Sequence, residues 1–412
     1  MSYLEQRDLE ATYMMTTYAR KPVEFVNGKG MRLYDSEGRE YLDFLSGIGC
    51  VCLGHGNEVV SEAIATQAQT LMLSSNYFYA KGRGELAREL SKLLNANNEE
   101  GAPWKSFFAN SGAEANEGAI KLARKYGKLH LKGAGTVLTA KQSFHGRTLA
   151  TTAATGQEAK QESFAPMPAG FSHIVPNDIE DLVEALEAGV KAAREQQRPE
   201  LAPVAVLLEC VQGEGGVLPL DEGYLKDVRA LTKEKGLLLI IDEIQTGFFR
   251  TGKPFSFMHA GIVPDVVTMA KGIANGFPCA AFAATGQAAD VFVPGEHGTT
   301  FGGNPLALAA ARATQTELAS QDMAKHVEVT GAYFKGKLAE LPHVKEVRGK
   351  GLMLAIELEG GSAAEVVNKA LERGMVLNSI GETVVRFLPP LIVSEAEIDE
   401  LVVVLEELLK EW

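Results

Sequence analysis

Residues 236–243 read GLLLIIDE, an unbroken apolar run that ends abruptly in an acid. An apolar run without polar alternation is typical of a strand buried on both faces, as in a parallel sheet. Asp242 would then stand at the carboxyl end of this strand, the edge at which open α/β sheets bind ligands. An acid at this point can equally cap a following helix, and the local pattern favours neither interpretation.

A second apolar run ends in a basic residue. Residues 265–270 read DVVTMA and are followed directly by Lys271 and Gly272. A lysine at such a place can be an ordinary solvated side chain. However, two strand ends that deliver an acid and an amine, with Gln245 just past the acid, suit a Schiff-base lysine and its electrostatic partner.

The surrounding sequence predicts an α/β protein. From about residue 57, amphipathic helical segments alternate with short apolar runs, which is typical of a mostly parallel central sheet covered by helices. The runs expected to form strands are Ser106–Ala109, Thr136–Thr139, Val204–Leu208, Leu237–Ile241 and Val266–Met269.

The two ends of the chain predict a smaller α+β lobe. Near the N-terminus, Val23–Val26, a turn at Asn27-Gly28 and Met31–Tyr34 indicate a small antiparallel meander. After about residue 310 a long helical stretch leads into further elements, namely strands at Val344–Val347, Leu352–Leu358 and Val384–Phe387 and a helix at Ala363–Arg373. We expect an N-terminal segment at 1–50, a large α/β domain at 51–310 and a small α+β domain at 311–412.

The composition opposes several classes of function. No segment of the 412 residues approaches the eighteen or so consecutive apolar residues of a membrane span. The 53 acidic and 40 basic residues give a formal net charge of -13, which opposes general binding to nucleic acids and anionic membranes. An anionic substrate would therefore need local arginines.

Cysteine usage and the N-terminus favour the cytoplasm. The four cysteines form no C-x-x-C pair, so they indicate neither a metal site nor a disulfide scaffold. Residues 1–20 mix charged and apolar residues and lack the pattern of a secretory signal. We expect a cytoplasmic protein without a bound metal.

Residues 107–114, FFANSGAE, predict a strand, a sharp turn and a helix start. Ser111 and Glu114 have the spacing of a capping box, which is a common structural feature. The same geometry, with Gly112 allowing close approach to the backbone, also makes a phosphate site. The loop at 299–305, TTFGGNP, offers similar chemistry but can equally be any tight turn.

Two arginines are candidates for anion binding. Arg147 follows a predicted strand and can be an ordinary surface residue. Arg386 lies among apolar neighbours in VVRFLPP, and a buried arginine needs an anionic partner. Glu209 and Glu214 are candidates for that partner.

Taken together, FFANSGAEANE, FHGRT, LLECVQGEGGV, LLLIIDEIQTGFFRTG, MAKGIANGFP, HGTTFGGNP and VVRFLPPLIVSEAEI resemble a class III, fold-type I aminotransferase from about residue 20 to the end. The resemblance implies pyridoxal 5'-phosphate as cofactor. It makes Lys271 the lysine that holds the cofactor and Asp242 the partner of the pyridine nitrogen. Gln245 would contact the phenolic oxygen of the cofactor, and Phe144 would stack on its ring.

The resemblance also implies a phosphate site and a dimer. Ser111, Gly112 and Ala113 match the phosphate-binding turn of the class. Thr300 matches a residue that reaches the phosphate in the neighbouring subunit, which implies a homodimer with shared active sites. Two positions depart from the pattern of the class. Cys210 replaces a proline that is usual there, and residues 273–276 contain fewer glycines than the class usually has. Neither departure affects a residue with a chemical role.

The same resemblance assigns the substrate residues. Arg147 and Arg386 match two arginines that bind substrate carboxylates in bidentate fashion, and Glu214 matches the acid that masks the second arginine. Ile48 occupies a position where ornithine aminotransferases have a tyrosine that meets a free α-amino group. An apolar residue there tolerates an acylated amine, which implies N-acetyl-L-ornithine as amino donor and 2-oxoglutarate as acceptor.

Other functions stay open at this point. Succinylornithine, succinyldiaminopimelate and 4-aminobutyrate are alternative donors. An intramolecular aminomutase on the same fold is a different class. Arg386 opposes it, because a mutase with one substrate needs no arginine that alternately receives a second carboxylate and is masked. A relative without catalytic activity is the third alternative, and the presence of Lys271, Asp242 and Gln245 makes it the least favoured.

Overall fold

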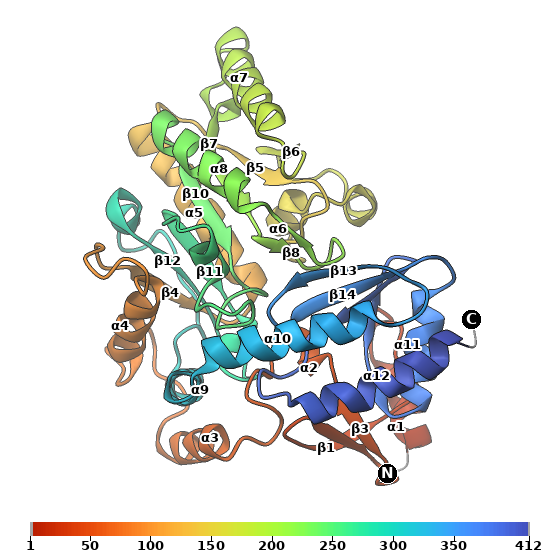
Figure 1. Cartoon of the computed structure of the whole chain (residues 1–412). Helices are drawn as coiled ribbons and strands as arrows, with labels where there is room; N and C mark the ends of the chain where they lie inside the picture. Colours follow the sequence, from red (N-terminus) through yellow and green to blue (C-terminus); the bar gives the residue numbers. More distant parts are fainter. Residues whose placement is uncertain (1–2, 411–412) are drawn as a thin grey trace.

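The computed structural model describes residues 3–410, and its centre is a seven-stranded sheet (Figure 1). Its strands, in spatial order, are β4 (Lys105–Ala109), β12 (Ala280–Ala284), β11 (Val266–Met269), β10 (Leu238–Asp242), β7 (Pro203–Leu208), β5 (Thr136–Ala140) and β6 (Phe171–Ile174). Only β12 runs antiparallel to its neighbours. The predicted strands are all present, and the prediction of a mostly parallel sheet in an α/β fold is confirmed.

Helices cover both faces of this sheet, which explains why its central strands β7 and β10 are predominantly apolar. Helix α5 (Gly112–His130) packs on one face, where Val137, Leu207 and Ile240 point. On the other face Leu138, Val206 and Leu239 pack against helices α7 (Ile179–Glu195) and α8 (Glu222–Lys235). Successive strand residues point to opposite faces, so neither face can be polar.

The chain ends build a second lobe with two smaller sheets, drawn in red and blue in Figure 1. One sheet has the order β1 (Phe25–Lys29), β2 (Arg32–Asp35), β3 (Glu40–Asp43) and β15 (Met375–Val376). The other has the order β13 (Val344–Lys350), β14 (Met353–Leu358), β17 (Val384–Phe387) and β16 (Asn378–Ile380). Since β15 pairs with β3, the first and last parts of the chain share one sheet. The domain boundaries at 50 and 310 stay a prediction.

The remaining helices surround these sheets. They are α1 (Tyr3–Tyr13), α2 (Ser46–Gly49), α3 (Glu58–Thr70), α4 (Arg83–Leu94), α6 (Leu149–Ala154), α9 (Pro305–Ser320), α10 (Met323–Ala339), α11 (Ala363–Glu372) and α12 (Glu395–Lys410). Within residues 3–410, no helix combines the length and apolarity that crossing a membrane requires.

One local prediction, the turn at Asn27-Gly28, was wrong. Asn27-Gly28 lies inside β1, and the chain turns at Gly30, whose φ is 58°. Close packing explains the glycine at position 28 instead, because a Cβ atom there would lie 2.8 Å from Cβ of His55. The helical stretch predicted after about residue 310 is present and consists of two helices, α9 and α10, separated by residues 321–322.

Candidate active site

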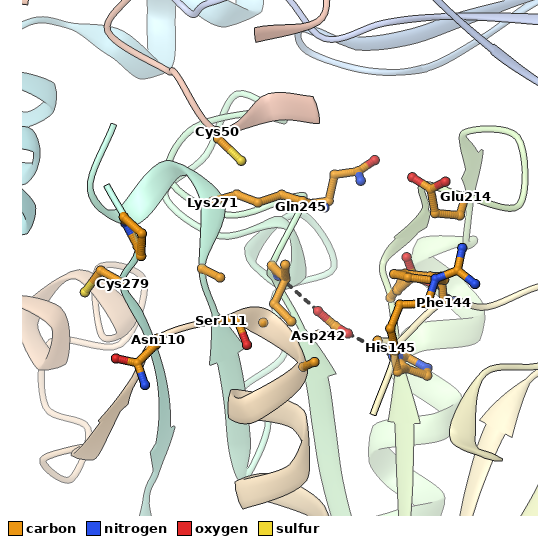
Figure 2. A pocket seen from close by; sticks show the side chains of 18 of the residues that line it. Cys50, Asn110, Ser111, Phe144, His145, Glu214, Asp242, Gln245, Lys271 and Cys279 are labelled. Carbon is orange, nitrogen blue, oxygen red and sulfur yellow. Dashed lines mark hydrogen bonds and ion pairs between the residues drawn. The ribbon is translucent and has the colours of Figure 1, made fainter. Parts of the chain in front are cut away.

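A cavity of about 360 Å³ opens where the parallel strands of the large sheet end (Figure 2). Its walls come from the segments that follow β4, β5, β7, β10 and β11, with Cys50 from the other lobe above them. The sequence-predicted residues that line it are Lys271, Asp242, Gln245, Ser111, Gly112, Ala113, Phe144, Arg147 and Glu214. Most of the expected site residues therefore meet in one cavity.

Lys271 directly follows β11 and faces this cavity with a left-handed backbone, φ 46°. Within residues 3–410 its amine has no hydrogen-bond or ion-pair partner. Burial lowers the pKa of Lys271, so its neutral, nucleophilic form is more accessible than that of a solvated lysine.

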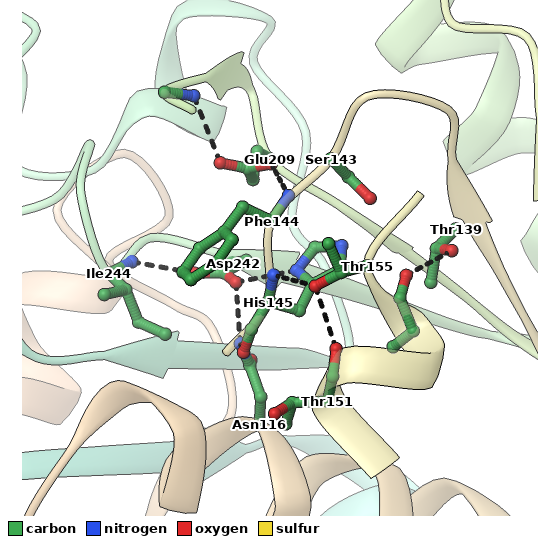
Figure 3. A network of polar contacts seen from close by, with 12 residues as sticks. Asn116, Thr139, Ser143, Phe144, His145, Thr151, Thr155, Glu209, Asp242 and Ile244 are labelled. Atoms are coloured by element: carbon green, nitrogen blue, oxygen red, sulfur yellow. Dashed lines mark hydrogen bonds and ion pairs between the residues drawn. The ribbon is translucent and has the colours of Figure 1, made fainter. Parts of the chain in front are cut away.

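Asp242 is held by three donors at the end of β10 (Figure 3). Its Oδ2 atom lies 2.8 Å from Nδ2 of Asn116 and 2.8 Å from Nδ1 of His145. Its Oδ1 atom accepts a bond of 3.0 Å from the amide of Ile244. No α-helix starts here within the described chain, so the helix-cap interpretation of Asp242 is wrong.

The sequence pattern did not single out His145 and Asn116. His145 stood inside the quoted FHGRT motif but had no role of its own. Asn116 is fully buried in α5, on the face that also carries Ala119 and Ala123. A polar residue on an otherwise apolar helix face was the signal that could have found it.

The first turn of α5 faces the same cavity. Ser111 caps the helix, because its side chain accepts a 3.3 Å bond from the amide of Glu114. The expected reciprocal half of the capping box is wrong, since Glu114 accepts from the amide of Asn110 at 2.9 Å. The amides of Gly112 and Ala113 belong to the unpaired first turn, a place where anions bind.

Arg386 is almost completely buried in β17, with 1% of its surface exposed. Its Nη1 atom donates to Oε1 of Glu214 at 2.6 Å and lies 3.4 Å from Oε1 of Gln245. Its Nε and Nη2 atoms donate to Oδ1 of Asn378 at 3.1 and 2.7 Å. Asn378, which the sequence pattern did not single out either, thus binds the outer edge of the guanidinium.

Of the two acids considered for Arg386, only Glu214 pairs with it. Burial raises the pKa of Glu214, but the charge and hydrogen bond of Arg386 outweigh it and leave the pKa lowered. Glu209 instead accepts from the amides of Phe144 and Gly213, at 2.9 and 3.2 Å. Burial raises the pKa of Glu209 to about 7.

Arg147 is exposed, and its guanidinium carbon lies 5.4 Å from the centroid of the Phe144 ring. In the part of the chain that the structure describes, Arg147 has no ion-pair partner. Three predicted residues are not among those that line this cavity, namely Arg386, whose partner Glu214 does line it, Ile48 and Thr300. Ile48 sits in the left-handed turn α2 with φ 65°, and Thr300 lines a separate hollow beside Thr299 and Tyr77.

Residues 13–409 match the family model of class-III aminotransferases. The chain belongs to this family. It is 47% identical over 407 residues to the acetylornithine aminotransferase of Caldanaerobacter subterraneus subsp. tengcongensis, covering 98% of each chain. It is 44% identical over 409 residues to that of Methanocaldococcus jannaschii, again covering 98% of each.

Solved structures agree with this assignment. The ornithine aminotransferase of Toxoplasma gondii ME49 superimposes with a TM-score of 0.90 at 32% identity, with 100% of this chain and 96% of that chain covered. The N-acetylornithine aminotransferase of Stenotrophomonas maltophilia K279a gives 0.80 at 34% identity, with 98% of each covered.

Pyridoxal phosphate is the cofactor of class-III aminotransferases and hence of this one. The cofactor needs an amine for its aldehyde, a buried acid for its ring nitrogen and an anion site for its phosphate. Lys271, Asp242 and the first turn of α5 are groups of these three kinds, and all three line one cavity. The residues present therefore fit the cofactor.

Proposed function

We propose that this aminotransferase moves the terminal amino group of N-acetyl-L-ornithine to 2-oxoglutarate, giving N-acetyl-L-glutamate 5-semialdehyde and L-glutamate. The reaction is a step of arginine biosynthesis, and we assign it to the cytoplasm. The observation that carries the proposal is the 2.6 Å ion pair between Arg386 and Glu214 at the cavity wall. Curated relatives of 43–47% identity, all acetylornithine aminotransferases, support the choice of donor.

In this proposal Lys271 would hold the cofactor and, once released from it, would take up and deliver the proton of the reacting substrate carbon. Asp242 pairs with the ring nitrogen, while Gln245 contacts the phenolic oxygen and Phe144 stacks on the ring. When bound, pyridoxal phosphate supplies an electron-withdrawing ring that stabilises the substrate carbanion and carries the amino group between half-reactions. The three donors around Asp242 fix the orientation in which its side chain would face the ring nitrogen.

The phosphate would lie on Ser111, Gly112 and Ala113, with Thr300 arriving from a second copy of the chain. A patch of exposed apolar side chains supports such a homodimer. It consists of Leu71, Met72, Leu73, Tyr77, Phe78, Tyr79 and Phe301. Asn76 ties this patch to the Thr300 loop by a 3.0 Å bond to the carbonyl of Thr299, and apolar patches of this kind mark protein interfaces.

The two half-reactions would share one cavity through a change of partner at Arg386. Arg147 binds the α-carboxylate of acetylornithine or the side-chain carboxylate of glutamate. With acetylornithine, Glu214 stays on Arg386, because no second carboxylate is present. With glutamate, the α-carboxylate takes Arg386, since a buried arginine left unpaired costs about 3 to 5 kcal/mol.

Ile48 would select the acylated donor, because an apolar side chain offers no partner to a free α-ammonium group. The experiment is a comparison of kcat/KM for N-acetylornithine, ornithine and 4-aminobutyrate, with 2-oxoglutarate as acceptor. N-acetylornithine should have the highest value. A higher value for ornithine or 4-aminobutyrate would refute this donor and leave the aminotransferase class intact.

A further inference from the structure

Glu214 needs a second partner if it leaves Arg386, a requirement that rests on the function proposed above. Its side chain is 29% exposed, and within residues 3–410 Arg386 is its only ion-pair partner. A partly buried carboxylate that loses its cation is destabilised unless another cation replaces it. The site should therefore contain a cation that receives Glu214 while the α-carboxylate of glutamate occupies Arg386.

Three basic groups act on the Glu214 carboxylate. Burial raises the pKa of Glu214, whereas Arg386, Lys271 and Lys160 each lower it. Arg386 is the partner that is lost, and Lys271 is committed to the cofactor. Arg147, the arginine that lines the cavity, is committed in the proposed function to the distal carboxylate of the substrate. Lys160 is the cation that remains.

Lys160 lies beside the wall that carries Glu214. Its Nζ atom is 5.6 Å from the centroid of the Phe144 ring, and it donates a hydrogen bond to the side chain of Gln157. Gln157 in turn donates to the carbonyl of Gln142 at 3.2 Å. That carbonyl oxygen would lie 2.9 Å from a Cβ atom placed on Gly215, the residue next to Glu214.

Lys160 is also free to form an ion pair with Glu214. It is half-buried and has no acidic ion-pair partner among the residues described. Burial, followed by the charge of Arg147, lowers the pKa of Lys160, and the charge of Glu214 raises it. An approaching carboxylate would therefore stabilise its ammonium form. Figure 2 shows Glu214 on the same side of the cavity as Phe144 and opposite Cys279 and Asn110.

We propose that Lys160 is the alternative partner of Glu214, with which the carboxylate pairs beside Phe144 whenever a substrate carboxylate occupies Arg386. Lys160 then stabilises the enzyme when it binds a substrate with two carboxylates, such as glutamate. It has almost no effect on the binding of a substrate with one carboxylate, such as acetylornithine. It is a specificity-determining residue that acts through Glu214 and does not touch the reacting atoms. A lysine in this place thus tunes the balance between donor and acceptor.

A double-mutant cycle tests this assignment. The holoenzymes of wild type, Lys160→Met, Glu214→Gln and the double variant are titrated with two unreactive probes. Glutarate carries both carboxylates of glutamate without its amine, and N-acetylnorvaline resembles acetylornithine without its terminal amine. Lys160→Arg tests rescue, and Lys128→Met, which removes a lysine exposed at the far end of α5, controls for net charge.

Lys160→Met should weaken glutarate binding about fivefold and change N-acetylnorvaline binding by less than about twofold. Lys160→Arg should restore wild-type affinity, and Lys128→Met should change neither probe. In the Glu214→Gln background the effect of Lys160→Met should disappear, because no displaced charge needs a partner.

Two outcomes would overturn the assignment in distinguishable ways. An undiminished Lys160→Met effect in the Glu214→Gln background would mean that Lys160 meets the ligand directly, and the proposed function would stand. If Glu214→Gln did not increase the affinity for glutarate relative to that for N-acetylnorvaline, Glu214 would not mask Arg386. The masking step of the proposed function would then fail together with the role of Lys160.

Discussion

The Nδ1 atom of His145 lies 2.8 Å from the Oδ2 atom of Asp242, and both side chains are almost completely buried. The Nε2 atom of His145 has no partner among the described residues. We infer that the ring proton sits on Nδ1, where it is donated to the carboxylate, because an unpaired buried N–H is more costly than an unpaired lone pair. His145 therefore orients Asp242 toward the cavity.

This arrangement predicts different effects for two substitutions of His145. His145→Leu removes the donor, so the Kd for pyridoxal phosphate, measured on the apoenzyme, should rise about tenfold or more. His145→Asn keeps an N–H at the δ position and should recover most of the affinity. Equal losses in both variants would mean that the imidazole only fills space.

Lys271→Ala should abolish the covalent link to the cofactor, since Lys271 is the amine that faces the cavity beside Asp242. The wild-type protein should be yellow, and the variant should lose the absorbance of the lysine-bound cofactor. Its transamination rate should fall to about one thousandth of wild type or less. Full activity together with an unchanged spectrum would show that another lysine holds the cofactor.

Thr300 should serve the active site of a second subunit, because it lines a hollow separate from the Lys271 cavity. Lys271→Ala and Thr300→Ala proteins are mixed, and subunit exchange is demonstrated with two affinity tags. Each mixed dimer would contain one site with both lesions and one intact site, so activity should recover to about a quarter of wild type. Exchange without recovery would contradict a shared site.

Glu243 should make stability fall as pH rises. Burial raises the pKa of this fully buried acid from its ordinary 4.5 to about 7. Between these values the folded chain keeps a proton that the unfolded chain has lost, so the free energy of unfolding decreases with increasing pH and levels off above 7.

Glu243→Gln removes this titration. Between pH 5 and pH 8 the variant should gain roughly 2 to 3 kcal/mol relative to wild type in urea unfolding. The exposed Glu99→Gln serves as the matched control and should show no such trend. A constant difference between Glu243→Gln and wild type at all pH values would mean that Glu243 is not the titrating group.

Local pattern was enough to predict the large sheet and the two central residues of the candidate site. The run that ends in Asp242 and the run before Lys271 are apolar because helices cover both faces of β10 and β11. Adjacent parallel strands end at one edge, so an acid and an amine that follow them must lie close together. The motifs between residues 107 and 398 were likewise sufficient for the family.

The partners of these residues were decided by the tertiary structure alone. Asp242 meets His145 and Asn116, which are 97 and 126 residues away along the chain. Arg386 meets Glu214, 172 residues away, and the sequence had left Glu209 as an equal candidate. Such pairs depend on strand order and on how the lobes pack, which are set by many weak long-range contacts summed over the whole chain. These contacts join distant parts of the chain, so a local stretch of sequence does not reveal them.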